Sequence, residues 1–450
     1  MNNWKDKIKK EKLVIIVLFF IFLTSVSYAF YYKIKPQVDA AAYDKVAVNI
    51  TEGNGFRIDP GLPLDKDEAI IYNGPLYQYF LSGIYAVFGH NYGAVWVIQS
   101  LLRILTAFLL FLICLKIFKD SKDGRRIGLI TMLFFGFYPD LIEINAMIMT
   151  ETLFIFLSVL TAYIFTRYYD NFNFKGSFLL GLSLALAVLI RSSAGVFILP
   201  FSFYFLTRKN YEYLAVFFLA FIIFMTPWAI RNYAVYHRFL PTMANFGYNP
   251  WMGNFAGGDG EWRYRPELAD AQKKYGIVGA NDYGVDQFKK TLKERPFEFI
   301  KLTTIRAVKY FSPIRPLGFW FYQHGWKQFI FISCSALASF LLFLFGFAGI
   351  ISSFFKEKRN HLLFYFLSFV FLTFVSIVPI IVETRYRLPI YPFIAVFAGF
   401  FISRFISFKK EYLNYLIYSF IFLMALLFVD LSLEYEKILE KIDVIFKYGK

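Results

Sequence analysis

Long apolar runs separated by short polar segments dominate this chain. A helix needs about 20 mostly apolar residues to cross a bilayer, because it rises about 1.5 Å per residue through about 30 Å of hydrocarbon. Runs of this kind lie at 13–32, 93–118, 127–148, 150–168, 176–206, 211–230, 328–354, 361–382, 388–406 and 411–430. The run 176–206 is long enough for two short spans that break at Arg191. The pattern predicts an all-α polytopic membrane protein with about eleven transmembrane helices.

Two long polar segments, 33–92 and 231–327, interrupt the apolar runs and are dense in Gly, Asp, Asn and aromatic residues. They predict a membrane region 1–230 that includes the first loop, a long loop 231–327, and a second membrane region 328–450. Within the first loop we expect a helix at Tyr43–Glu52. A second, aromatic-rich helix is expected at Leu76–Phe88, closed by Gly89 and lying along the membrane surface.

The placement of Lys and Arg predicts the orientation. Positive charge gathers in 1–12 and 116–126 and in the other short loops on the same side, whereas 139–150 has no Lys or Arg. By the positive-inside rule the N-terminus is cytoplasmic and both long loops are extracytoplasmic, in the plasma (inner) membrane. We interpret 13–32 as a retained first span, because it is 20 residues long and has no small-x-small cleavage site before Tyr31-Tyr32-Lys33. The net charge of +16 is then mostly a topology signal, and nucleic acid is not a predicted partner.

Composition agrees with a membrane protein and excludes several enzyme classes. Hydrophobic residues make up 58% of the chain and charged residues only 18%, where soluble proteins carry about 25%. Both cysteines, Cys114 and Cys334, lie in apolar runs, which excludes a disulfide framework and a cysteine-ligated metal site. No phosphate-cradling GxxxxGK[ST], GxSxG or HExxH motif occurs. An enzyme of this sequence therefore needs a substrate that is already activated.

Several short motifs follow one another in a specific order. The first loop contains Asp39-x3-Tyr43-Asp44, then Gly53-x-Gly55-Phe56, then Asn73-Gly74-Pro75-Leu76-Tyr77. Further along are Tyr138-Pro139-Asp140, Thr150-Glu151, Arg191, Pro227-Trp228-x2-Arg231-Asn232, Trp251-Met252-Gly253-Asn254 and Arg385-Tyr386-Arg387-Leu388-Pro389. This ordered set resembles the glycosyltransferase superfamily with the C-type (GT-C) fold. It is most similar to the dolichyl-phosphate-mannose–protein mannosyltransferase-like family, which includes the bacterial lipid A aminoarabinose transferases.

The resemblance implies a membrane glycosyltransferase that moves a sugar from a polyprenyl-phosphate donor to an acceptor hydroxyl of a glycan, lipid or protein. The family's first-loop aspartate is regarded as the catalytic base, and Asp39 occupies that position. Asp44 is then a nearby acid that positions the acceptor or holds a metal, and Tyr43 and Tyr77 support the site. No cofactor is required, and a divalent metal is possible but not indicated. Without the resemblance, Asp39 would be interpreted as a solvated loop acid or, as the helical run that follows it favours, a helix N-cap.

Three arginines are candidates for binding the donor phosphate. Arg385 is the first choice and Arg387 the second, because both lie at the outer mouth of a span. The alternative is that they snorkel to the interface, with Glu383 as a possible partner for Arg385. Arg191 lies within an apolar run, where a charge needs a partner or a wet cavity. Glu151 is that expected partner, and the alternative for the pair is a purely structural ion pair.

A non-enzymatic transporter or flippase of lipid-linked glycans would show the same apolar pattern. Transporters of this kind often show paired broken spans in two matching halves, and no such repeat is evident. Acids in an external loop beside the membrane also favour the enzyme.

Overall fold

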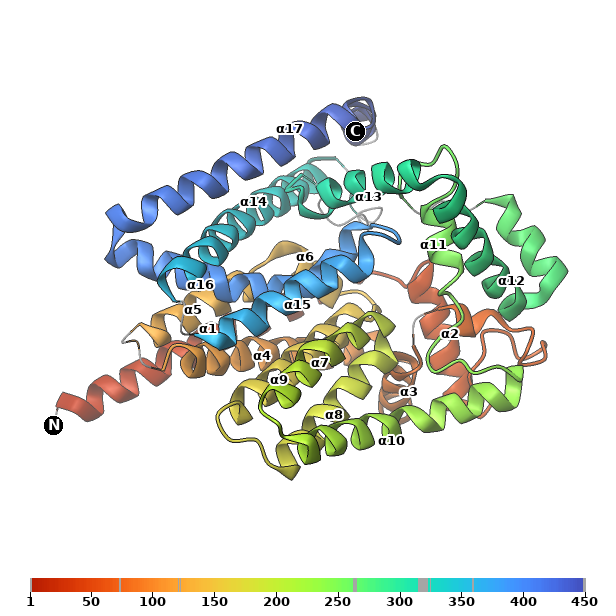
Figure 1. The fold of residues 1–450 in the computed structure, drawn as a ribbon, viewed down its shortest axis with the longest axis horizontal. Coiled ribbons are helices and arrows are strands. Elements are labelled where there is room, and N and C mark those ends of the chain that lie inside the picture. Colours follow the sequence, from red (N-terminus) through yellow and green to blue (C-terminus); the bar gives the residue numbers. More distant parts are fainter. Residues whose placement is uncertain are drawn as a thin grey trace.

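The computed structural model describes residues 2–72, 74–119, 121, 123–261, 265–314, 323, 325–357 and 360–447, with side chains at 12–436 and 439 within these ranges. The described residues are helical with connecting turns and contain no strand. Helices lie roughly parallel and form a bundle, with a group of shorter and more oblique helices at one end (Figure 1). The all-α polytopic fold class predicted from the sequence is therefore confirmed.

The bundle helices coincide with the predicted apolar runs. In the first half they are α1 (Asn2–Tyr32), α4 (Tyr92–Ile117), α5 (Gly124–Gly136), α6 (Pro139–Asn145), α7 (Glu151–Tyr168), α8 (Phe174–Ile190), α9 (Ile198–Thr207) and α10 (Tyr211–Tyr236). In the second half they are α14 (Gly325–Lys356), α15 (His361–Ile377), α16 (Tyr391–Ser407) and α17 (Lys409–Lys447). Among the described residues, six helices are long and apolar enough to cross a membrane, and the bent pair α5–α6 would add a seventh. The predicted number of about eleven spans is thus not confirmed.

Two predicted runs break, one as expected and one not. Helix α8 ends at Ile190, Arg191 is extended, and the 3-10 helix η2 (Ser192–Phe197) follows, which confirms the predicted break at Arg191. The run 127–148 was predicted as a single span, without a break. It consists of α5 and α6, whose axes are bent by 58°. Gly136 ends α5 and Pro139 begins α6, because proline fits the first turn of a helix and cannot continue an earlier one.

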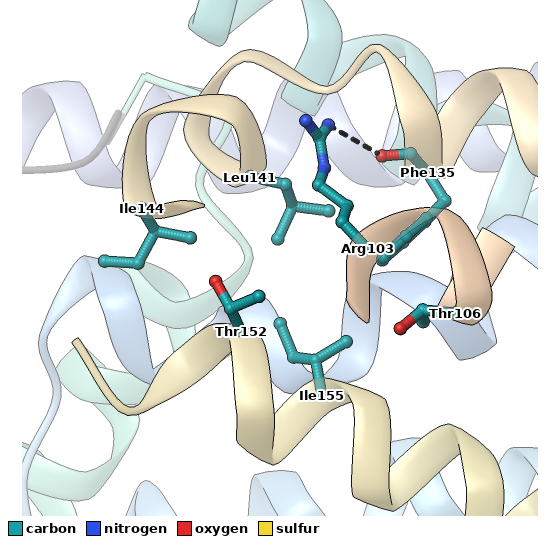
Figure 2. Close-up of a pocket in the computed structure, with 7 residues that line it drawn as sticks. All are labelled: Arg103, Thr106, Phe135, Leu141, Ile144, Thr152 and Ile155. Carbon is teal, nitrogen blue, oxygen red and sulfur yellow. Dashed lines mark hydrogen bonds between the residues drawn. The ribbon is translucent and has the colours of Figure 1, made fainter. Parts of the chain in front are cut away.

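The bend leaves carbonyl groups at the end of α5 without helical donors, and the guanidinium of Arg103 on α4 donates hydrogen bonds to them instead. Its Nη2 donates to the carbonyl oxygens of Gly136 at 2.6 Å and Phe135 at 3.4 Å, and its Nη1 donates to Ser25 Oγ of α1 at 2.6 Å. Figure 2 shows the guanidinium reaching the Phe135 carbonyl beside a small cavity that Thr106, Thr152 and Ile155 also line. The buried arginine thus holds three helices at the bend.

The remaining helices come from the two long loops and lie at the end of the bundle opposite the N-terminus (Figure 1). The first loop contains α2 (Asp39–Thr51), η1 (Glu68–Ile71) and α3 (Leu76–Phe88); α2 begins at Asp39 rather than at the predicted Tyr43. The second loop contains α11 (Tyr248–Gly253), α12 (Pro266–Glu294) and α13 (Pro296–Phe311). Backbone bonds join the loops, with the amide of Ala244 donating to the carbonyl of Ile70 at 2.9 Å. The two loops therefore form one cap.

Glycines allow α14 and α16 to approach closely. A Cβ added at Gly346 would collide with Ile394, and one added at Gly349 would collide with the Phe397 carbonyl. Small residues at such contacts let two backbones pack at short range inside a membrane protein. This contact matters for function because α16 carries at its N-terminal end the 3-10 helix η4 (Thr384–Ile390).

We predict that Gly349→Ala lowers the free energy of unfolding in detergent by about 1–3 kcal/mol, because the carbonyl it meets belongs to a rigid helix backbone. The matched control is Gly83→Ala on α3, where an added Cβ meets nothing within 4 Å. That control should be neutral or slightly stabilising, since alanine favours helix over glycine. Equal stability of the two variants in a denaturant titration would contradict the packing described here.

Candidate active site

Asp39 lies at the first turn of α2, directly outside the end of α1. The turn that places it passes through Val38, whose φ of 50° is rare for a β-branched residue. Val38 occupies the N-cap position and no side chain caps the helix, so Asp39 is not the N-cap considered from the sequence. Its carboxylate Oδ2 instead lies 2.7 Å from Nη1 of Arg385. The first loop and the region before α16 meet in this ion pair.

Arg385 contacts two carboxylates. Besides Asp39, its Nε donates to Oε2 of Glu383 at 2.8 Å. The side chain of Arg385 is only 10% exposed, against 24% for Asp39 and 33% for Glu383. The guanidinium therefore lies beneath its two acidic partners, and Glu383 is the partner most open to solvent.

Arg191 and Glu151 form a second ion pair beside the first. Nη2 of Arg191 lies 2.6 Å from Oε1 of Glu151, whose side chain is fully buried, and Nε donates to Thr150 Oγ1 at 3.1 Å. Tyr386 connects the two pairs, because its ring lies 5.7 Å from the Arg191 guanidinium and 5.4 Å from that of Arg385. The predicted partnership of Arg191 with Glu151 is confirmed, while their catalytic role stays a prediction.

The Gly74-Pro75 motif brings the first loop against this second pair. The Gly74 amide donates to the carbonyl of Ile190 at 3.0 Å, and a Cβ at Gly74 would collide with the Leu189 carbonyl. Glycine is therefore needed for α3 to begin beside the break that presents Arg191. Asn73, the preceding residue of the motif, lies outside the described residues.

Tyr43 of α2 and Tyr77 of α3 form a buried aromatic pair, and Tyr43 lies one turn after Asp39. Their rings pack edge to face with centroids 5.7 Å apart, and the Tyr77 hydroxyl donates to Gln99 Oε1 at 3.0 Å. Burial raises the pKa of Tyr43 well above its ordinary value, and the Asp39 carboxylate adds to this shift. Both tyrosines therefore stay neutral and act by packing.

Asp44 faces away from Asp39. Its carboxylate accepts hydrogen bonds from Tyr85 at 2.6 Å and Tyr92 at 2.7 Å, and it lies 2.9 Å from His90 Nε2. These contacts fasten α2 to α3 and α4. We had expected Asp44 to lie beside Asp39 as the acid that positions the acceptor. The structure does not bring the two together, because Asp44 contacts α3 and α4 instead.

Arg387 also points away from the Asp39 ion pair. It is 1% exposed, its Nη1 donates to the carbonyl of Ser312 at the end of α13, and its guanidinium lies over the rings of Phe343 and Tyr391. It belongs to the packing between the cap, α14 and α16. Among the described residues, no group of three His, Cys, Asp or Glu side chains could hold a metal ion.

Comparison with known proteins agrees with this architecture. Residues 72–230 match the family model described as dolichyl-phosphate-mannose-protein mannosyltransferase, which confirms over this segment the resemblance seen in the sequence. The oligosaccharyltransferase of Archaeoglobus fulgidus in the apo form matches with a TM-score of 0.51 at 15% identity, covering 94% of this chain and 55% of that one. The chain has a GT-C glycosyltransferase fold.

Two further solved structures are similar to the chain. Archaeal oligosaccharyltransferase AglB from Archaeoglobus fulgidus, in complex with an inhibitory peptide and a dolichol-phosphate, matches with a TM-score of 0.52 at 14% identity, covering 97% of this chain and 56% of that one. ArnT from Cupriavidus metallidurans bound to undecaprenyl phosphate has a TM-score of 0.41 at 12% identity, covering 88% and 78%. The chain thus spans little more than half of the oligosaccharyltransferases. No curated protein matches it in sequence.

Sequence reasoning did not single out two residues that the structure places in the site. Tyr386 separates the two arginines of its motif, and only the fold shows that its ring also faces Arg191. Thr150 was quoted only as part of a motif, yet its hydroxyl accepts from Arg191. Arg103, which lies outside the site, was also missed. Like Arg191 it is a charge within an apolar run, and this signal could have indicated that it needs buried polar partners.

We predict that Glu151→Gln lowers the free energy of unfolding by about 3–5 kcal/mol, because it leaves the Arg191 charge buried without its anion. Replacing both residues, as Glu151→Gln with Arg191→Met, should restore part of the loss. Asp286→Asn is the control, since its pair with Lys289 is exposed and should contribute little. Additive losses in the double variant, measured by denaturant titration, would show that the pair is not coupled.

Proposed function

We propose that this chain is a membrane glycosyltransferase that transfers a sugar from a polyprenyl-phosphate donor to an acceptor hydroxyl. The transferred group is a hexosyl or pentosyl residue. The N-terminus is cytoplasmic and the cap with its site is extracytoplasmic, as the distribution of Lys and Arg indicates. The observation that carries the proposal is the contact between Asp39 and Arg385 at the junction of the bundle and the cap.

The two residues supply the two functions that such a transfer needs. Asp39 accepts the proton of the acceptor hydroxyl while the oxygen of that hydroxyl bonds to the anomeric carbon. The bond from that carbon to the phosphate oxygen breaks, and its electron pair stays on the departing polyprenyl phosphate. Arg385 stabilises the negative charge that grows there, which favours the transition state over the ground state. A single displacement of this kind inverts the anomeric carbon.

An apolar groove between α13 and three helices of the bundle supports a lipid-linked substrate. It is lined only by apolar residues of α13, α14, α15 and α17, namely Phe311, Phe347, Ile350, Ile351, Leu367, Val370, Phe371, Phe374 and Phe422. Helix α15 leads from this groove through Val378 to Glu383 and Arg385. A polyprenyl chain in the groove would keep its phosphate near the end of α15, on the side of the cap.

The comparisons support the same class of donor. A solved structure with this fold is described in complex with a dolichol-phosphate and an inhibitory peptide. The matched family is named for a dolichyl-phosphate sugar donor and a protein acceptor. In our proposal no metal is required, because arginine supplies the positive charge that a cation would otherwise provide. Asp44, tied to Tyr85 and Tyr92, acts by holding α2 in place.

We predict that Asp39→Asn lowers turnover by at least about 100-fold, because asparagine keeps the size of the side chain and removes its basicity. Binding of the donor should not weaken, since asparagine adds no negative charge. The assay is the initial rate of sugar release from a polyprenyl-phosphate sugar in detergent. Asp65→Asn is the control, because Asp65 is an exposed acid in the same loop. Turnover of Asp39→Asn within a few-fold of the parent would move the base elsewhere.

Arg385→Lys should lower turnover clearly in a folded protein, because lysine lacks the planar fork that meets a phosphate with two parallel bonds. Arg385→Ala should nearly abolish turnover. Arg387→Lys is the comparison, since its guanidinium contacts the Ser312 carbonyl and aromatic rings instead. That variant should lose thermal stability more than turnover per folded molecule. An inactive, stable Arg387→Lys beside a fully active Arg385→Lys would assign the phosphate to Arg387.

A further inference from the structure

Arg385 is held on both sides by acids of its own chain, although the proposed function assigns it to a phosphate. Asp39 contacts Nη1 and Glu383 contacts Nε. A guanidinium presents two edges to a phosphate, one formed by Nε and Nη2 and the other by the two Nη groups. Glu383 therefore covers one of these edges with a carboxylate whose two oxygens resemble those of a phosphate.

The charge balance of the site is unfavourable for a phosphate as long as Glu383 stays there. Arg385 interacts electrostatically with Glu383, Asp39 and Glu151, and Arg191 lies beside Glu151. These five groups carry two positive and three negative charges when ionised. The donor phosphate brings one more negative charge, and the departing polyprenyl phosphate brings up to two. One of the carboxylates must leave the guanidinium before a phosphate can bind it.

Glu383 is the carboxylate best placed to leave. Among the described residues, Arg385 is the only polar partner of its side chain, which is also the most exposed of the three acids at 33%. It is the N-cap residue of η4, with an extended backbone of φ −131° and ψ 156°, and its carbonyl accepts from the Tyr386 amide while its side chain lies outside the helix. Glu151 is buried against Arg191, and Asp39 belongs to the first turn of α2.

We propose that Glu383 is a stand-in for the donor phosphate, which keeps Arg385 oriented in the empty site and is displaced when the donor binds. The inference rests on the proposed function, because it assumes that Arg385 receives a phosphate. The stand-in lowers affinity for the donor and for the polyprenyl phosphate product equally. Its benefit is that the guanidinium is already in place when the donor arrives, and that the product is released by the same competition.

The test is the affinity of the purified full chain for undecaprenyl phosphate in detergent, compared between the parent and Glu383→Gln. Glutamine keeps the shape and removes the competing charge, so the dissociation constant should fall by about fivefold, the scale of a partly exposed ion pair. Undecaprenol, which has the tail and no phosphate, should bind both proteins equally. Glu267→Gln removes one negative charge from the exposed start of α12 and should change neither affinity.

An unchanged or weaker affinity of Glu383→Gln for undecaprenyl phosphate would overturn the stand-in. Tighter binding by Asp39→Asn without any change in Glu383→Gln would also overturn it and name Asp39 as the displaced acid. If Glu383→Gln does not fold, Glu383→Ala replaces it with the same expected direction. The proposed function can fail separately. If Glu383→Gln binds undecaprenyl phosphate more tightly but the parent chain never releases polyprenyl phosphate from a sugar donor, the role of Glu383 holds and the proposed enzyme activity is wrong.

Discussion

The ion pair between Asp39 and Arg385 is the contact on which the rest of this site depends. It joins the first helix of the cap to the segment that precedes α16, and it puts a carboxylate and a guanidinium within 2.7 Å at the junction of bundle and cap. A charge removed from water must be paired or bound by several hydrogen bonds, so the position of each residue constrains the position of the other. Neither side chain keeps its position unless α2 and η4 are both fixed.

Separate sets of contacts fix these two elements. Asp44 fastens α2 to the hydroxyls of Tyr85 and Tyr92, and Arg387 fastens η4 to the end of α13. Arg306 of α13 adds to this, because its guanidinium donates to the carbonyls of Val378, Pro379 and Gly253 and to Oδ1 of Asn254. Arginine thus binds backbone carbonyls where α13 and α15 end, since its five donors can satisfy several carbonyls at once.

Apolar runs in the sequence predicted the bundle helices well, and chemistry predicted some of the residues that gather, but not the directions in which Asp44 and Arg387 point. The length of the run 176–206 predicted a break at Arg191, and the charge inside this run predicted a polar partner for Arg191. The structure shows both the break and the pair with Glu151. Asp39 and Asp44 were assigned to one site, yet five residues along an α-helix turn the side chain by about 140° net. Arg385 and Arg387 differ by two residues in a 3-10 helix, which turns them about 120° apart. The sequence could not resolve these directions because the start of α2 and the 3-10 form of η4 depend on tertiary contacts.

The central claim is that this chain breaks the bond between a sugar and a lipid phosphate, and the most direct measurement is the fate of that phosphate. The purified chain, reconstituted in vesicles with a labelled polyprenyl-phosphate sugar and membranes as a source of acceptor, should release free polyprenyl phosphate in step with sugar transfer. Asp39→Asn should release almost none. Movement of the intact labelled lipid between leaflets without any free polyprenyl phosphate would contradict the account and identify a flippase instead.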